Sequence, residues 1–146
     1  MAFTGLQIGF LWNDYDVVEV SIHASNGDFG GTAKAYVSRG GLAGAASILE
    51  GFPRQTSDTR ELELGSVDPK FAGGGVSMKF FCRDSAGHAA IELRIVSNGS
   101  NAPWWDAPSQ SVHMFANVEA AAIDEFAVEL RRLDAEQTGL ASLRFA

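Results

Sequence analysis

Residues 76–96 constrain the fold of this chain more than any other stretch. Apolar residues occupy every second position in two runs, which are Val76, Met78, Phe80 and Cys82, then Ile91, Leu93 and Ile95. The intervening residues 84–87 read Asp-Ser-Ala-Gly, which is typical of a turn. A period of two with one apolar face indicates half-buried antiparallel strands. The stretch therefore predicts a β-hairpin whose apolar face the rest of the chain must cover.

The same alternation predicts five further strands, and a period of 3.6 predicts two helices. The strands are expected at residues 5–12, 18–23, 32–38, 60–64 and 111–116. Asn26-Gly27 predicts a tight turn after the second of them, and the pair Gly30-Gly31 predicts a β-bulge. The first helix is expected at residues 41–51, and the second carries its apolar face from Ile123 to Leu133. Residues 140–145 form an apolar tail that we expect to dock on the body of the protein.

This order of elements predicts one domain over residues 1–146 with an α+β fold. We expect a twisted antiparallel meander of about six to seven strands with two helices packed on one face. A remote duplication of a β-β-β-α unit is one interpretation of the order, and its basis is compositional. It compares the helical segment near residue 45 with the one near residue 125.

The charge of the chain restricts its partners. The formal net charge is −7, and the sequence pI is about 4.8. We therefore expect no binding to nucleic acid or to anionic membrane surfaces, since both need a basic protein surface. An acidic surface steers association with basic proteins. The single cysteine and a first segment without basic residues predict a cytoplasmic protein without a secretory signal, and no apolar run reaches 18 residues.

No motif of catalysis, metal binding or nucleotide binding stands in the sequence. His23 and His113 with Glu19 and Glu92 would form a metal set if their strands paired, but the spacing typical of metal sites is absent. Cys82 alternates with apolar residues and is expected in the core. We therefore predict no cofactor, no metal, no catalytic residues and no enzymatic activity, with an enzyme as the least favoured of three hypotheses.

Two groups of residues are candidates for contact with a partner. Trp104 and Trp105, followed by Asp106, stand in a loop of small polar residues, and tryptophan is enriched in binding hot spots. Asp14, Asp16 and Asp28 belong to a segment of 33 residues without Lys or Arg, which predicts a negative field. Burial of the tryptophans as a loop anchor and simple solvation of the acidic residues are the alternatives to a binding role.

The layout resembles the WapI-type immunity family of small bacterial proteins and related uncharacterised bacterial families. The similar parts are the turn Asp28-Phe29-Gly30-Gly31, the helical segment Leu42–Phe52, the pair Gly87-His88 before a strand, and the closing segment Ala120–Leu133. This resemblance implies a cytoplasmic antidote that binds and neutralises a toxin. It transfers no family binding residues to this chain.

The sequence therefore leaves two main functional hypotheses. The first is a non-enzymatic binding protein for a basic partner, with a toxin as the partner that the resemblance implies. The second is a small-ligand-binding domain with a pocket between the sheet and the loops at residues 65–75 and 97–110. Homodimerisation through an exposed edge strand is compatible with either hypothesis.

Overall fold

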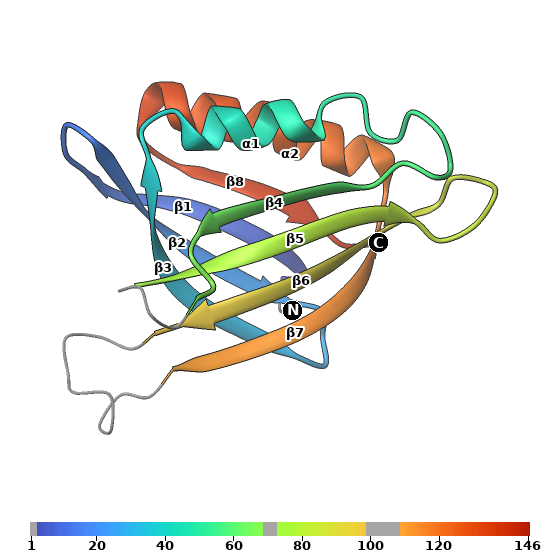
Figure 1. The fold of residues 1–146 in the computed structure, drawn as a ribbon, viewed down its shortest axis with the longest axis horizontal. Helices are drawn as coiled ribbons and strands as arrows, with labels where there is room; N and C mark the ends of the chain where they lie inside the picture. The colour runs from blue at the N-terminus through green and yellow to red at the C-terminus, as the bar shows by residue number, and fades with distance from the viewer. Residues whose placement is uncertain (1–2, 69–72, 99–108) are drawn as a thin grey trace.

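The fold is known from a computed structural model that describes residues 3–68, 73–98 and 109–146. These residues form two helices and eight strands arranged in two antiparallel sheets, which confirms the predicted α+β class (Figure 1). No helix in the described ranges is long and apolar enough to cross a membrane.

The chain consists of two halves with the same order of elements. The first half contains β1 (Gly5–Asn13), β2 (Val17–Ser25), β3 (Gly30–Ser38), α1 (Gly41–Leu49) and β4 (Arg60–Gly65). The second half contains β5 (Gly74–Cys82), β6 (Ala89–Ser97), β7 (Gln110–Val118), α2 (Ala120–Glu136) and β8 (Leu140–Arg144). The first three strands of each half all have nine residues.

The last strand of each half belongs to the sheet that the other half forms. Sheet A has the order β3-β2-β1-β8, and sheet B has the order β4-β5-β6-β7. Strand β8 pairs with β1, and β4 pairs with β5, both antiparallel. The repeated order and the reciprocal exchange are the arrangement that a duplication of a β-β-β-α-β unit would leave.

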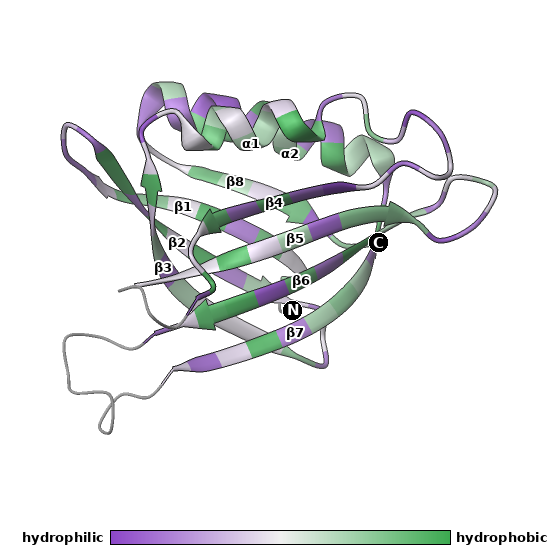
Figure 2. Ribbon diagram, in the orientation of Figure 1, coloured by the Kyte–Doolittle hydropathy of each residue, from purple (hydrophilic) through white to green (hydrophobic). Residues whose placement is uncertain are grey.

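The two sheets face each other, and the helices lie side by side along one edge of the pair, next to β8 and β4 (Figure 1). Buried residues from both sheets and both helices form one apolar core. The ring of Phe52, just after α1, meets the ring of Phe80 on β5 edge to face, with 6.2 Å between centroids. Strands β4 to β6 alternate hydrophilic and hydrophobic residues along their length, as a sheet with one buried face requires (Figure 2).

Three details differ from the sequence predictions. The apolar tail is an eighth strand rather than a docked segment, since Leu6 and Ile8 of β1 pair with Leu143 and Ala141 of β8. The meander is divided between two sheets. The pairing of β2 with β3 runs without interruption through the two glycines at its end, so the bulge predicted there is wrong. Those glycines serve close packing instead, since a Cβ on Gly31 would lie 3.0 Å from Val112 of β7.

Two of the four sheet edges are packed against helices, because α1 contacts β4 and α2 contacts β8. On the free edge of β7, the side-chain amide of Asn26 donates to the Phe115 carbonyl at 3.3 Å. The amide of Ala146 donates to the Asn117 carbonyl at 2.7 Å. Dimerisation through an edge strand therefore stays a prediction that concerns β3 and the first part of β7.

Arg60 fastens the end of α1 to the start of β4. Its guanidinium donates to both carboxylate oxygens of Asp58, at 3.0 and 2.8 Å. It also donates to the carbonyls of Ile48 and Glu50 at 2.8 and 3.0 Å, which are carbonyl groups at the end of α1. The side chains of Arg60 and Asp58 are only 18% and 13% exposed, respectively. The hydrogen bond from Arg60 is the main reason why the pKa of Asp58 lies below its ordinary value.

Replacing Arg60 with methionine is expected to lower the free energy of unfolding by about 2 kcal/mol at pH 7. The loss should shrink in acid, because a carboxyl with a lowered folded-state pKa stabilises the fold above its unfolded pKa of about 3.9. That contribution disappears as the pH falls through the folded pKa. Urea unfolding at pH 7 and pH 3 measures both effects.

The matched control for Arg60→Met is Arg132→Met, because the Arg132 side chain is 55% exposed and its guanidinium lies 3.8 Å from the Glu129 carboxylate. Such a pair contributes about 0.5 kcal/mol or less. Equal losses in the two variants would contradict the role given to Arg60.

Candidate functional site

The β1–β2 hairpin ends in a turn that its own side chains hold in place. The Asp14 carboxylate accepts hydrogen bonds from the amides of Asp16 and Val17, both at 2.8 Å. Arg39, which follows β3, donates from its guanidinium to the carbonyls of Asp14 and Tyr15 at 2.9 and 3.4 Å. The Arg39 amide also donates to the Asp16 carbonyl at 3.0 Å. The Asp14 side chain therefore fixes the turn from within, and Arg39 ties the backbone of the tip to the end of β3.

A β-bulge in β1 decides where Trp12 points. Phe10 pairs with Val20 of β2, and Trp12 pairs with Glu19, so Leu11 is the extra residue. Val20 is fully buried, and Phe10 packs against the core beside it. Without the bulge, the period of two would place Trp12 on the same inner face as Phe10. The extra residue turns Trp12 to the outer face of sheet A.

On that outer face, Trp12, Glu19 and Tyr36 form one row across three strands. Glu19 of β2 pairs directly with Trp12 of β1 on one side and with Tyr36 of β3 on the other. Directly opposed residues in antiparallel strands have their Cβ atoms about 4.5–5.5 Å apart on the same face. Glu19 therefore has an aromatic residue directly opposite it on each neighbouring strand.

Several large apolar side chains are exposed at this end of sheet A. The exposed fractions are 44% for Leu11, 51% for Trp12, 88% for Tyr15 and 49% for Tyr36. Single exposed apolar residues are ordinary, but a group of them marks an interaction site on a soluble protein. We call the set formed by Leu11, Trp12, Asp14, Tyr15, Asp16, Glu19 and Tyr36 the hairpin surface.

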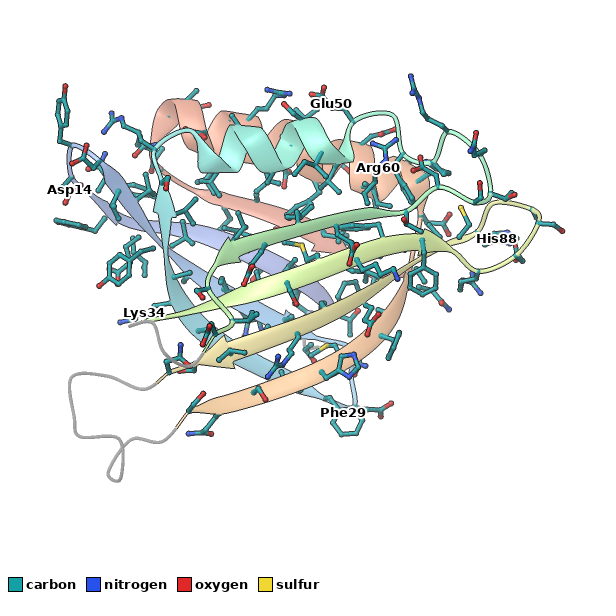
Figure 3. All side chains as sticks on the ribbon, in the orientation of Figure 1. Asp14, Phe29, Lys34, Glu50, Arg60 and His88 are labelled. Carbon is teal, nitrogen blue, oxygen red and sulfur yellow. The ribbon has the colours of Figure 1, made fainter. Side chains whose placement is uncertain are left out.

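The structure separates the acidic residues that the sequence grouped together. Asp14 and Asp16 lie in the β1–β2 turn, whereas Asp28 lies in the β2–β3 turn at the other end of β2. Figure 3 shows Asp14 at the left end of the molecule and Phe29, the neighbour of Asp28, at its lower edge, well away from Asp14. Nine residues of β2 separate the two turns, which corresponds to about 30 Å. Asp28 is therefore not part of the hairpin surface.

Trp104, Trp105 and Asp106 lie outside the described residues, so the predicted binding role of this loop stays a prediction.

The two histidines considered for a metal site are on different sheets. His23 lies on β2 of sheet A with Glu19, and His113 lies on β7 of sheet B. His113 Nε2 is 2.8 Å from Glu92 Oε2 on β6, on the outer face of sheet B. Within the described part of the chain, no three His, Cys, Asp or Glu residues are grouped so as to hold a metal ion.

The third histidine belongs to the β5–β6 turn. His88 Nδ1 is 2.7 Å from Asp84 Oδ2, and this hydrogen bond lowers the pKa of Asp84. Both side chains are exposed, at 60% and 43%. The pair stabilises a turn, since the Asp84 carboxylate also accepts from the amides of Ala86 and His88.

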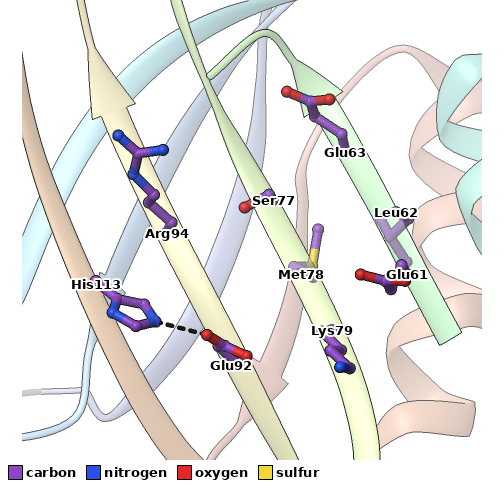
Figure 4. A pocket seen from close by; sticks show the side chains of 9 residues that line it. All are labelled: Glu61, Leu62, Glu63, Ser77, Met78, Lys79, Glu92, Arg94 and His113. Carbon is purple, nitrogen blue, oxygen red and sulfur yellow. Dashed lines mark hydrogen bonds and ion pairs between the residues drawn. The ribbon is translucent and has the colours of Figure 1, made fainter. Parts of the chain in front are cut away.

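The outer face of sheet B contains a hollow of about 550 Å³ (Figure 4). Charged and polar side chains cross it in two rows, which are Glu61, Lys79 and Glu92, then Glu63, Ser77, Arg94 and His113. Charges of opposite sign on neighbouring strands are common on the solvent-facing side of a sheet, where each pair stabilises it slightly. The mixture of signs in this hollow selects no particular ligand.

Two smaller hollows adjoin the loops named in the ligand-pocket hypothesis. One of about 430 Å³ has Lys34, Gly73 and Ser97 in its lining. The other, of about 340 Å³, lies between Gly31 and Thr32 of β3 and Gln110 and Val112 of β7. Ser97 at the end of β6 lines both hollows, together with Gly73 just before β5 in the first and Gln110 at the start of β7 in the second.

No family model, no curated protein and no solved structure matches this chain.

Sequence reasoning selected Asp14 and Asp16 at this site but missed Trp12, Tyr15 and Tyr36. Trp12 continues the inward series of Leu6, Ile8 and Phe10, so a regular strand predicts that it is buried. Trp12 is exposed only because of the bulge at Leu11. Residues 11–13 contain no glycine, so the sequence gives no indication of a bulge there. Tyr36 was detectable, because it alternates with the buried residues Ala35 and Val37 of β3.

Proposed function

We propose that this protein acts by binding a basic protein partner through the hairpin surface, without catalysis of its own. The observation that carries the proposal is the gathering of exposed aromatic side chains with acidic ones at one end of sheet A. Trp12, Tyr15 and Tyr36 are 49% to 88% exposed and lie beside Asp14, Asp16 and Glu19.

The composition of this surface favours a protein partner. Tryptophan and tyrosine supply most of the binding energy in many interfaces, because they bury a large area with few rotatable bonds. Arg39 holds the turn through the Asp14 and Tyr15 carbonyls, so little conformational entropy is left for binding to remove. The net charge of −7 favours encounter with a basic protein.

Neutralisation of a toxin in the bacterial cytoplasm is the particular form of this proposal that the resemblance to WapI-type immunity proteins implies. An acidic binding protein suits that role, since it would cover a basic functional surface on the toxin. Co-expression tests this part directly: growth of cells that produce the captured basic partner should recover when this protein is produced with it.

The double variant Trp12→Ala/Tyr15→Ala is expected to weaken partner binding by about 100-fold or more, since each hot-spot residue contributes about 2 kcal/mol. The immobilised wild type captures the partner from lysate of the source organism, and calorimetry with the purified partner then measures the affinity. The matched control is Val128→Ala on α2, which removes an apolar side chain that is 63% exposed and should not change binding.

Unchanged affinity in the Trp12→Ala/Tyr15→Ala variant would contradict the hairpin surface as the interface. The variant Trp104→Ala/Trp105→Ala belongs in the same series. If this variant alone loses the partner, the loop predicted from the sequence is the interface and the hairpin surface is not.

A small-ligand-binding domain is the second candidate. The hollow beside Lys34, Gly73 and Ser97 supports it, because it adjoins both loops of that hypothesis. A deep pocket with converging polar groups is typical of such sites. Retention of a low-molecular-mass compound by the purified protein, detected by native mass spectrometry, would favour this candidate over a protein partner.

A further inference from the structure

We propose that Trp12, Glu19 and Tyr36 form a subsite for one arginine side chain of the partner. The inference deepens the proposed function and rests on it for the identity of the ligand. In this subsite, two aromatic rings and one carboxylate of the hairpin surface recognise a planar cation.

The backbone fixes the order of these groups. Glu19 stands on the central strand of the three, and its direct partners are Trp12 and Tyr36. The spacing of about 5 Å between neighbouring Cβ atoms leaves both rings within reach of a cation above the carboxylate. No other row on the outer face of sheet A that the structure describes combines a carboxylate with two aromatic residues.

The Glu19 carboxylate is available for a ligand. It forms no ion pair and no side-chain hydrogen bond with any residue in the described ranges, although it is only half-exposed. Its own sheet supplies no cation to it: Lys34, on the same outer face, pairs with Ser21 in the next row and makes no ion pair with Glu19. A cation from a partner would therefore meet an unneutralised charge.

Tyr36 is held at the border of sheet A and sheet B. Its ring packs over Gly73, where a Cβ would lie 3.3 Å from the Tyr36 ring. Gly73 is itself fixed, because its carbonyl accepts a hydrogen bond from the Asn98 amide at 2.8 Å. The Tyr36 side of the subsite is therefore already in position in the unbound protein.

Arginine suits this arrangement better than lysine. Its guanidinium is planar, stacks on aromatic faces and donates two parallel hydrogen bonds to a carboxylate. Tryptophan is the strongest of the aromatic partners for a cation. Arg39 does not fill the subsite, since its guanidinium is engaged by the carbonyls of Asp14 and Tyr15.

The test titrates the full-length protein with the blocked tripeptide acetyl-Gly-Arg-Gly-amide, with the citrulline analogue as its uncharged isostere. The readout is the Trp12 indole N–H signal in ¹⁵N NMR spectra, assigned by its absence in Trp12→Phe. We expect a saturable shift with the arginine peptide at millimolar concentration and none with citrulline. Glu19→Gln should weaken the binding about tenfold, because it removes the charge of the carboxylate and leaves a side chain of the same size.

An equal shift with the citrulline peptide, an unchanged affinity in Glu19→Gln, or no saturable shift would each overturn the arginine subsite. The assay with the purified partner separates this failure from that of the proposed function. If Trp12→Ala/Tyr15→Ala loses the partner but Glu19→Gln binds it like the wild type, the hairpin surface stands and the arginine subsite falls. If both variants bind the partner normally, the proposed function itself is wrong.

Discussion

Leu143→Ala is expected to lower the free energy of unfolding by about 2–5 kcal/mol, which is the range for truncating a fully buried leucine. Leu143 is 0% exposed and pairs with Leu6 across the contact of β8 with β1. The same substitution at Leu140, on the same strand but 54% exposed, should cost about 0.5 kcal/mol or less. Urea unfolding followed by circular dichroism measures both losses.

This pair of variants tests the exchange of strands between the halves. If β8 were an apolar tail docked loosely on the surface, the two leucines would have similar effects. A large loss at Leu143 with a small one at Leu140 requires the alternation that only a paired strand produces. Comparable losses at the two positions would contradict the register between β1 and β8.

Gly65→Ala is expected to lower the free energy of unfolding by about 3–5 kcal/mol, through backbone strain and overpacking together. Gly65 ends β4 with φ of +72°, a conformation that costs other residues about 1–2 kcal/mol. A Cβ there would also collide with the Gly74 carbonyl and lie 2.6 Å from Ala35 Cβ on β3. Thermal and urea unfolding both report the loss.

Gly87→Ala is the matched control for Gly65→Ala. Gly87 has a similar φ of +83°, but no atom lies within 4 Å of a Cβ built on it. Its substitution should therefore cost only the strain of about 1 kcal/mol. Equal losses at the two glycines would show that β3 does not approach the end of β4 as closely as described.

The close approach of β3 to Gly65 affects the position of Tyr36 in the hairpin surface. Ala35, which a larger residue at position 65 would displace, immediately precedes Tyr36 on β3. The ring of Tyr36 in turn packs over Gly73, just before β5. The two glycines thus set the distance between sheet B and the strand that carries one wall of the arginine subsite.

Local pattern was sufficient for the class of fold. The alternation in residues 76–96 determined β5 and β6, and the helical spacing from Ile123 to Leu133 determined the inner face of α2. Such periodicities follow from backbone geometry alone, so a sequence carries them without knowledge of distant contacts. The exposure of Asp14 and its place in a turn were predictable for the same reason.

Only the tertiary structure decided how the elements are joined and where the aromatic residues gather. The pairing of β8 with β1, which makes Leu140–Arg144 a strand of sheet A, depends on contacts between residues more than 100 positions apart. The place of β4 in sheet B depends on its pairing with β5, the next strand along the chain. The extra residue at Leu11 reverses the side on which Trp12 lies, against the pattern of the strand that contains it. Glu19 acquires its two aromatic neighbours from other strands. Strand alternation indicates which residues share a face, but the register between strands decides which of them meet.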